Sequence, residues 1–97
     1  MLHHVVLLRF KESTTPGAIT AITESLMSLE SQISTLRYFS VNTDLGLAAD
    51  NAHMIIMAMF DDQAGYEFYR DHPAHQKVIR EQISEQLVSR SAAQYAS

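Results

Sequence analysis

The chain has 97 residues, of which 46% are hydrophobic and 19% are charged, and it contains no cysteine. This length predicts one domain over residues 1–97, and the composition excludes a disordered chain, a disulfide framework and a thiolate metal site. A net charge of −4 with seven scattered lysines and arginines excludes nucleic acid and anionic membranes as principal partners, because both require clustered positive charge. The apolar N-terminal stretch is too short to span a membrane and lacks the basic and small-residue flanks of a signal peptide, so we expect a cytoplasmic protein.

A strand followed by a long helix is predicted for the first third of the chain. Residues 2–11 are rich in β-formers and end in a polar run. Thr15 suits the N-cap of a helix and Pro16 its first position. Apolar residues then recur at spacings of three and four, which predicts an amphipathic helix of about five turns ending near Ser34. These residues are Ile19, Ile22, Leu26, Leu29 and Ile33.

The remaining elements complete a β-α-β-β-α-α-β order. Strands are predicted over residues 36–43 and 53–60, and a short helix follows the candidate caps Asp61 and Asp62. Pro73 ends that helix and opens another, in which apolar residues up to Leu87 recur at helical spacing, before a weakly supported strand near residues 87–95. The order predicts the α+β class, a ferredoxin-like fold with an antiparallel four-stranded sheet whose first and third strands are central.

Both faces of this predicted sheet are apolar. The first strand places Val6 and Leu8 on one face and Val5 and Leu7 on the other. The third strand carries Ile55, Met57 and Met59 on one face and Met54, Ile56, Ala58 and Phe60 on the other. Because the helices cover only one face, and burying each such side chain is worth roughly 1.5–3 kcal/mol, the other face needs a cover. A second copy of the same sheet is the simplest one, which predicts a homodimer formed through the sheet face.

The segment 66–75 carries the side chains that are most suggestive of chemistry. A histidine exchanges protons near neutral pH and a tyrosine hydroxyl polarises a carbonyl, so His75 and Tyr69 form a candidate acid/base pair, with His72 beside them. His4 is a third candidate, because it lies at the end of the sheet where the third strand leaves for the Tyr69 helix. His53 is expected at the opposite end of the sheet.

Each of these residues also has a purely structural interpretation. His72 precedes Pro73 and suits a helix cap, His75 suits a donor to a nearby carbonyl, and Tyr69 suits a core aromatic with a satisfied hydroxyl. The His-x-x-His spacing occurs in metal sites, but it does not match the helical His-Glu-x-x-His pattern, so we expect no metal. The sequence has no phosphate-binding or dinucleotide-binding glycine motif, so we expect no cofactor.

Two segments resemble the stress-responsive α/β-barrel (Dabb) family. They are His-Val-Val-Leu-Leu-Arg-Phe-Lys at 4–11 and Tyr-Arg-Asp-His-Pro-Ala-His at 69–75, and the resemblance extends from residue 2 to about residue 95. It implies a dimeric ferredoxin-like α/β barrel with two sheets face to face. Most members of the family have no assigned activity, and a few are cofactor-free polyketide cyclases. In those cyclases the second histidine of the motif is the base and the tyrosine assists it, which corresponds here to His75 and Tyr69.

The sequence therefore favours two functions. The first is a homodimer that binds a small apolar or aromatic ligand in a cavity on the helix side of the sheet. The second is a cofactor-independent cyclase-like enzyme that performs aldol-type carbonyl chemistry with His75 as base and Tyr69 as polarising group; a cofactor-free monooxygenase stays open as a third alternative. In either case we expect the cavity to be lined by Leu26, Leu29, Phe39, Val78 and Ile79.

Overall fold

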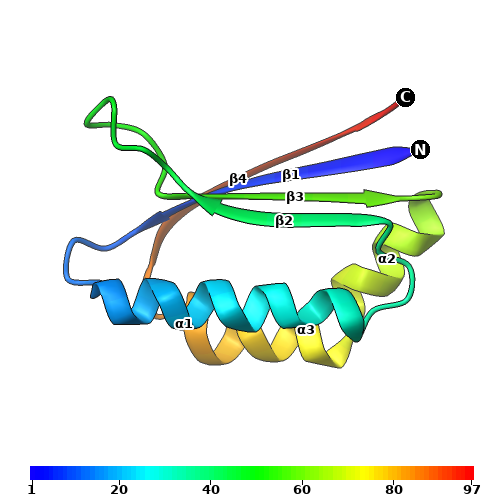
Figure 1. Ribbon diagram of the computed structural model, residues 1–97, viewed down its shortest axis with the longest axis horizontal. Coiled ribbons are helices and arrows are strands. Elements are labelled where there is room, and N and C mark those ends of the chain that lie inside the picture. Colours follow the sequence, from blue (N-terminus) through cyan, green and yellow to red (C-terminus); the bar gives the residue numbers. More distant parts are fainter.

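The computed structural model describes all 97 residues, and its elements follow the predicted order (Figure 1). The first half contains β1 (Leu2–Phe10), α1 (Pro16–Met27), a 3₁₀ turn η1 (Ser28–Ser31) and β2 (Tyr38–Thr43). The second half contains β3 (Met54–Phe60), α2 (Gln63–Asp71), α3 (Pro73–Val78), a π-helical turn η2 (Ile79–Ile83) and β4 (Leu87–Ala96). The predicted α+β ferredoxin-like arrangement is confirmed.

The strands form one antiparallel sheet in the order β2-β3-β1-β4, so β1 and β3 are central. All the helices lie on one side of this sheet, as Figure 1 shows. The register places His4 opposite Ala58 of β3 and opposite Gln94 of β4. Directly opposed residues share a face of the sheet, so all three side chains lie on the face that the helices cover, where Ala58 and His4 are buried.

The two faces of the sheet differ in what covers them. On the helix side, the side chains of the central strands are buried beneath the helices, and Leu8 and Phe60 have at most 2% of their surface exposed. On the other side Leu7 and Met57 each remain 39% exposed, because no other element of the chain lies on that side (Figure 1). The alternation follows directly from the period of two in an extended strand. The prediction of a sheet that is apolar on both faces is confirmed.

Side-chain caps set where the helices begin. The Thr15 hydroxyl accepts a hydrogen bond from the backbone N–H of Ala18 at 3.1 Å, and α1 starts at Pro16. The Asp62 carboxylate accepts one from Gly65 N–H at 2.9 Å and opens α2. These caps satisfy N–H groups that have no partner within the helix.

Two predicted boundaries are corrected. The helix α1 ends at Met27 and tightens into a 3₁₀ turn, instead of continuing to Ser34. The hydroxyl of Ser28 bonds back to the Ser25 carbonyl at 2.6 Å, and such local bonds compete with regular helix. The strand expected near residues 87–95 is confirmed as β4, but Leu87 does not also extend the preceding helix, because the chain leaves that helix through a turn after Ile83. None of the helices combines the length and the apolar character needed to cross a membrane.

Candidate functional site

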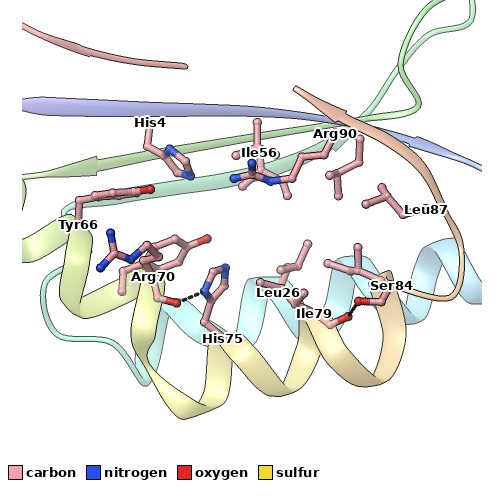
Figure 2. Close-up of a pocket in the computed structure, with 14 residues that line it drawn as sticks. His4, Leu26, Ile56, Tyr66, Arg70, His75, Ile79, Ser84, Leu87 and Arg90 are labelled. Carbon is pink, nitrogen blue, oxygen red and sulfur yellow. Dashed lines mark hydrogen bonds between the residues drawn. The ribbon is translucent and has the colours of Figure 1, made fainter. Parts of the chain in front are cut away.

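A partly enclosed cavity of about 100 Å³ lies between the helix-covered face of the sheet and the helices α2, α3 and η2 (Figure 2). This volume is of the order that admits one aromatic ring. Its apolar wall consists of Val6, Leu8, Leu26, Ile56, Ile79, Ile83 and Leu87. Its polar groups come from His4, Tyr66, Tyr69, Arg70, His75, Ser84 and Arg90.

His75 presents a free nitrogen to this cavity. Pro73 occupies the first position of α3, so His75 lies in the first turn with its ring directed towards the sheet (Figure 2). The Nδ1 atom of His75 lies 3.0 Å from the backbone oxygen of Arg70 and donates to it. In a neutral ring this leaves Nε2 as an acceptor with a free lone pair. Burial lowers the pKa of His75 below 6.5, so the ring is neutral at pH 7 and Nε2 is able to take a proton.

Tyr69 lies against His75 and is almost completely buried, with 2% of its surface exposed. The two ring centroids are 4.2 Å apart, with 31° between the ring planes. No side-chain hydrogen bond of the protein involves the Tyr69 hydroxyl. Burial raises the pKa of Tyr69, so the hydroxyl keeps its proton and remains a hydrogen-bond donor towards the cavity.

His4 faces the same cavity from β1 (Figure 2). Its Nδ1 atom lies 2.9 Å from the side-chain amide nitrogen of Gln94, which can only donate, so the ring proton resides on Nε2. His4 is thus a donor where His75 is an acceptor. Burial, the charge of Arg90 and the neighbouring His75 lower the pKa of His4 to about 4, so it is neutral at physiological pH.

The helix that follows the motif widens beside the cavity. Residues 79–83 form a π-helical turn, in which the backbone N–H of Ser84 bonds to the Ile79 carbonyl at 2.9 Å. Ile79 and Ile83 both line the cavity, and with His75 they follow a spacing of four that keeps one face of the helix towards it. Single π turns of this kind occur frequently at functional sites.

The structure brings five of the predicted site residues to the cavity: His4, Tyr69, His75, Leu26 and Ile79. As expected, His53 is at the other end of the sheet, where it accepts a hydrogen bond from Phe10 N–H at 2.9 Å. The structure therefore places a histidine and a tyrosine side by side at one apolar cavity.

The other four predicted residues lie outside the cavity, so its expected lining is corrected. His72 caps α3, because its Nδ1 accepts from Ala74 N–H at 3.1 Å. Leu29 and Val78 are buried on the side where α1 and α3 face each other, and together they line a separate polar depression. Phe39 is a core residue whose ring lies 6.1 Å from that of Tyr69. The cavity is lined by residues of β4, α3 and η2, and Leu26 is its only lining residue from α1.

Several residues of the site were not predicted from the sequence, including Gln94, which contacts His4 without lining the cavity. Tyr66 precedes Tyr69 by three positions, and its ring centroid lies 4.9 Å from that of His4, with 54° between the ring planes. The helical spacing of the two tyrosines is a signal that could have identified Tyr66. Arg90 and Gln94 reach the site only through the pairing of β4 with β1, which no local pattern reveals. No three histidine, aspartate or glutamate side chains converge in a way that would hold a metal ion.

Comparisons with known proteins agree with this fold. The model of the stress-responsive A/B barrel domain (Dabb) family matches residues 2–96. A dimeric ferredoxin-like protein of unknown function from Thermobifida fusca is 31% identical, covers 99% of this chain and 90% of its own, and superposes with a TM-score of 0.90. No match was found among curated proteins.

Two more distant structures share the fold. A Dabb family protein from Mesorhizobium loti is 21% identical, with coverage of 99% of this chain and 95% of its own and a TM-score of 0.83. A hydroxynitrile lyase from Passiflora edulis is 18% identical, with coverage of 97% and 90% and a TM-score of 0.84. The family match extends over almost the whole sequence, and the chain therefore belongs to the stress-responsive A/B barrel domain (Dabb) family.

Proposed function

We propose that this protein is a homodimer that binds a small apolar or aromatic molecule in the cavity of each chain. The observation that carries the proposal is the set of unpartnered polar atoms facing an apolar space: the Tyr69 hydroxyl, His75 Nε2 and His4 Nε2. Polar groups beside apolar surface gain free energy when they find a hydrogen-bond partner. A ligand with one ring and one or two polar substituents would satisfy them while its ring contacts Leu26 and Ile79.

The dimer forms through the sheet face that the helices leave open. Leu7 and Met57 lie at the centre of that face and are each 39% exposed in the single chain. Solved relatives are described as dimeric ferredoxin-like proteins, which supports the same assembly here. Pairing through this face leaves the ligand cavities on the outer, helix-covered sides of the two sheets, so each chain keeps its own site.

A matched pair of substitutions tests ligand binding, with benzyl alcohol as the probe. Leu87→Trp places a larger side chain at the cavity wall, whereas Val88→Trp changes the next residue, which is 59% exposed and does not line the cavity. We expect calorimetric titration to show binding to the wild type and to Val88→Trp, and loss of binding in Leu87→Trp. Equal affinity in all three proteins would place the ligand elsewhere, and no binding to the wild type would refute the proposal for this class of ligand.

A second candidate function is cofactor-independent carbonyl chemistry at the same cavity. It is favoured by the specific protonation of the pair: His75 Nε2 carries a free lone pair and Tyr69 keeps its hydroxyl proton. In the proposed step, Nε2 of His75 removes a proton from the carbon next to a ligand carbonyl, and the C–H electron pair moves into the C–C bond. The carbonyl oxygen becomes an enolate oxygen that accepts a hydrogen bond from Tyr69. The existence of a hydroxynitrile lyase with this fold supports an enzymatic use of it.

Exchange of hydrogen for deuterium tests this second function without a known substrate. Acetophenone in D₂O exchanges its methyl hydrogens when a base forms the enolate. We expect the protein to accelerate this exchange, and His75→Gln to reduce the acceleration by about 10²-fold or more. The control is His53→Gln, which changes a histidine at the other end of the sheet. If the wild type gives no acceleration, or His75→Gln retains it, His75 is not a base for this chemistry.

A further inference from the structure

The charged side chains that line the cavity are all positive. The protein as a whole carries a net charge of −4, with eleven aspartates and glutamates, yet none of these carboxylates lines the cavity. Two arginines line it. Arg70 is neutralised by Asp71, with 2.8 Å between the guanidinium Nε and the carboxylate. Arg90 forms neither an ion pair nor a side-chain hydrogen bond within the protein. The cavity therefore contains one cation without a counter-ion.

The sheet register explains why Arg90 reaches this space. Arg90 pairs with Leu8 of β1, and Leu8 faces the helices and lines the cavity. The side chain of Arg90 therefore extends from the edge strand over the cavity, as Figure 2 shows. Ala92 lies two positions further along the same face, opposite Val6, and its side chain is short. Because Arg90 faces the helices, a dimer formed through the opposite face does not cover it.

A guanidinium in this position is suited to a carboxylate. Its planar fork of N–H donors matches the two oxygens of a carboxylate, and the hydrogen bonds are strengthened by charge. The apolar wall of the same cavity, which includes Leu87 and Ile83, limits the access of water to such a pair, which strengthens the interaction relative to a fully solvated ion pair. Arg90 is exposed, so a neutral ligand would leave its guanidinium hydrogen-bonded to water alone.

We infer that the cavity selects small aromatic or apolar acids, whose carboxylate is bound by Arg90 while the ring lies against Leu26 and Ile79. This inference rests on the proposed ligand-binding function and specifies its ligand class. It also gives the ligand a direction: the anionic end is held from β4, and the rest of the molecule extends towards Tyr69 and His75.

The test compares benzoate with benzyl alcohol, which has nearly the same shape and no charge. We expect the wild type to bind benzoate about tenfold more tightly than benzyl alcohol, a ratio typical of one charge-assisted hydrogen-bonded contact. Arg90→Gln should remove this preference, so that benzoate and benzyl alcohol bind the variant with similar affinity. The matched control is Arg80→Gln, since Arg80 is an exposed residue of η2 that does not line the cavity, and it should keep the preference.

The possible results separate the two proposals. If benzyl alcohol binds but benzoate is not preferred, or if Arg90→Gln keeps the preference, the role of Arg90 is overturned and the ligand-binding function stands. If neither compound binds to the wild type, the ligand-binding function fails for this class and the inference about Arg90 fails with it. Thermal unfolding of each variant shows whether a lost preference reflects a lost fold.

Discussion

His4 and His75 face one cavity with opposite hydrogen-bonding character, and a group behind each ring sets that character. The amide nitrogen of Gln94 occupies Nδ1 of His4, and the Arg70 carbonyl occupies Nδ1 of His75. The first partner is a donor and the second an acceptor, so the two Nε2 atoms present a proton and a lone pair respectively. A ligand therefore meets a donor from the sheet and an acceptor from the helix.

The buried His4 should make the stability of the protein depend on pH. Its pKa is about 4 in the folded protein, against 6.5 for an unperturbed histidine. Between these values the unfolded chain binds a proton that the folded protein does not, so stability falls as the pH is lowered from 6.5 towards 4. We expect a loss of roughly 2 kcal/mol from His4, less than the full shift implies because water partly screens the site.

Urea unfolding at pH 7 and pH 4.5, at one protein concentration, measures this effect. His4→Gln carries no titrating ring at this position, so its stability should change less than that of the wild type between the two pH values. The change that remains includes the contribution of His75, whose pKa burial also lowers. An identical loss of stability in the variant and the wild type would show that His4 does not titrate as described.

The sequence predicts the cavity residues whose neighbours are close in the chain. It does not predict those that reach the cavity through pairing with a distant strand. Tyr69 and His75 belong to one short segment, and the helix caps between them follow from residue type. Arg90 and Gln94 belong to a strand that mixes polar and small or apolar residues with only weak alternation. Their place at the cavity depends on the pairing of β4 with β1 across more than eighty positions of the chain, which residue spacing does not encode.

At the scale of elements, α2 and α3 act together to hold the polar wall of the cavity. The helix α2 supplies Tyr66 and Tyr69, and α3 supplies His75. The chain between them is fixed by His72, which ends α2 in an extended conformation and caps α3. Pro73 cannot continue the first helix but suits the start of the second. The break therefore turns the chain and places the His75 ring against that of Tyr69.

Removing the Asp62 carboxylate, which caps α2, should lower the stability more than removing the neighbouring carboxylate of Asp61. Asp62 accepts the hydrogen bond from Gly65 N–H, and Asp62→Ala should lower the free energy of unfolding by about 1 kcal/mol. Asp61 forms an ion pair with Arg37 in which the side chains are 57% and 49% exposed, so Asp61→Ala should change it by less than about 0.5 kcal/mol. Chemical denaturation compares the two, and an equal loss in both variants would contradict the assignment of the cap.

The elements themselves were largely predictable, and their ends were less so. Runs of apolar, β-forming residues predict β1 and β3, and the three–four spacing of apolar residues predicts α1. The apolar pattern predicts too late an end for α1, because Leu29 and Ile33 continue the pattern although the backbone between them has left the α-helix. The apolar spacing continues because these side chains remain buried. Serine side chains change the local hydrogen bonding of the backbone, which the apolar spacing does not reveal.

At the scale of the whole molecule, a second apolar feature lies on the open side of the sheet. The loop between β2 and β3 rises away from the helices (Figure 1). It carries Leu45 and Leu47, which are 84% and 86% exposed. The Asp44 carboxylate holds the turn by accepting from Gly46 N–H at 2.8 Å. Apolar side chains displayed on a braced loop beside an uncovered apolar face fit the proposed dimer, in which both would be covered.

Two methionines of equal exposure test this assembly. Met57 lies on the open face and Met27 on α1, and each is 39% exposed. Met57→Glu places a charge at the centre of the proposed interface and should convert the dimer to single chains, because burying an unpaired carboxylate is costly. Met27→Glu should leave the dimer intact. Sedimentation velocity at micromolar concentration distinguishes the two masses, and a wild-type protein that sediments only as a single chain would refute the dimer.

The proposed function requires that a ligand binds in the cavity between the sheet and the helices α2 and α3. Histidine side-chain NMR during a titration with benzyl alcohol measures this within one sample. The predicted result is that the ring signals of His4 and His75 shift together and saturate, while that of His53, at the far end of the sheet, stays in place. Saturable binding that shifts His53 and leaves His4 and His75 unchanged would contradict the claim.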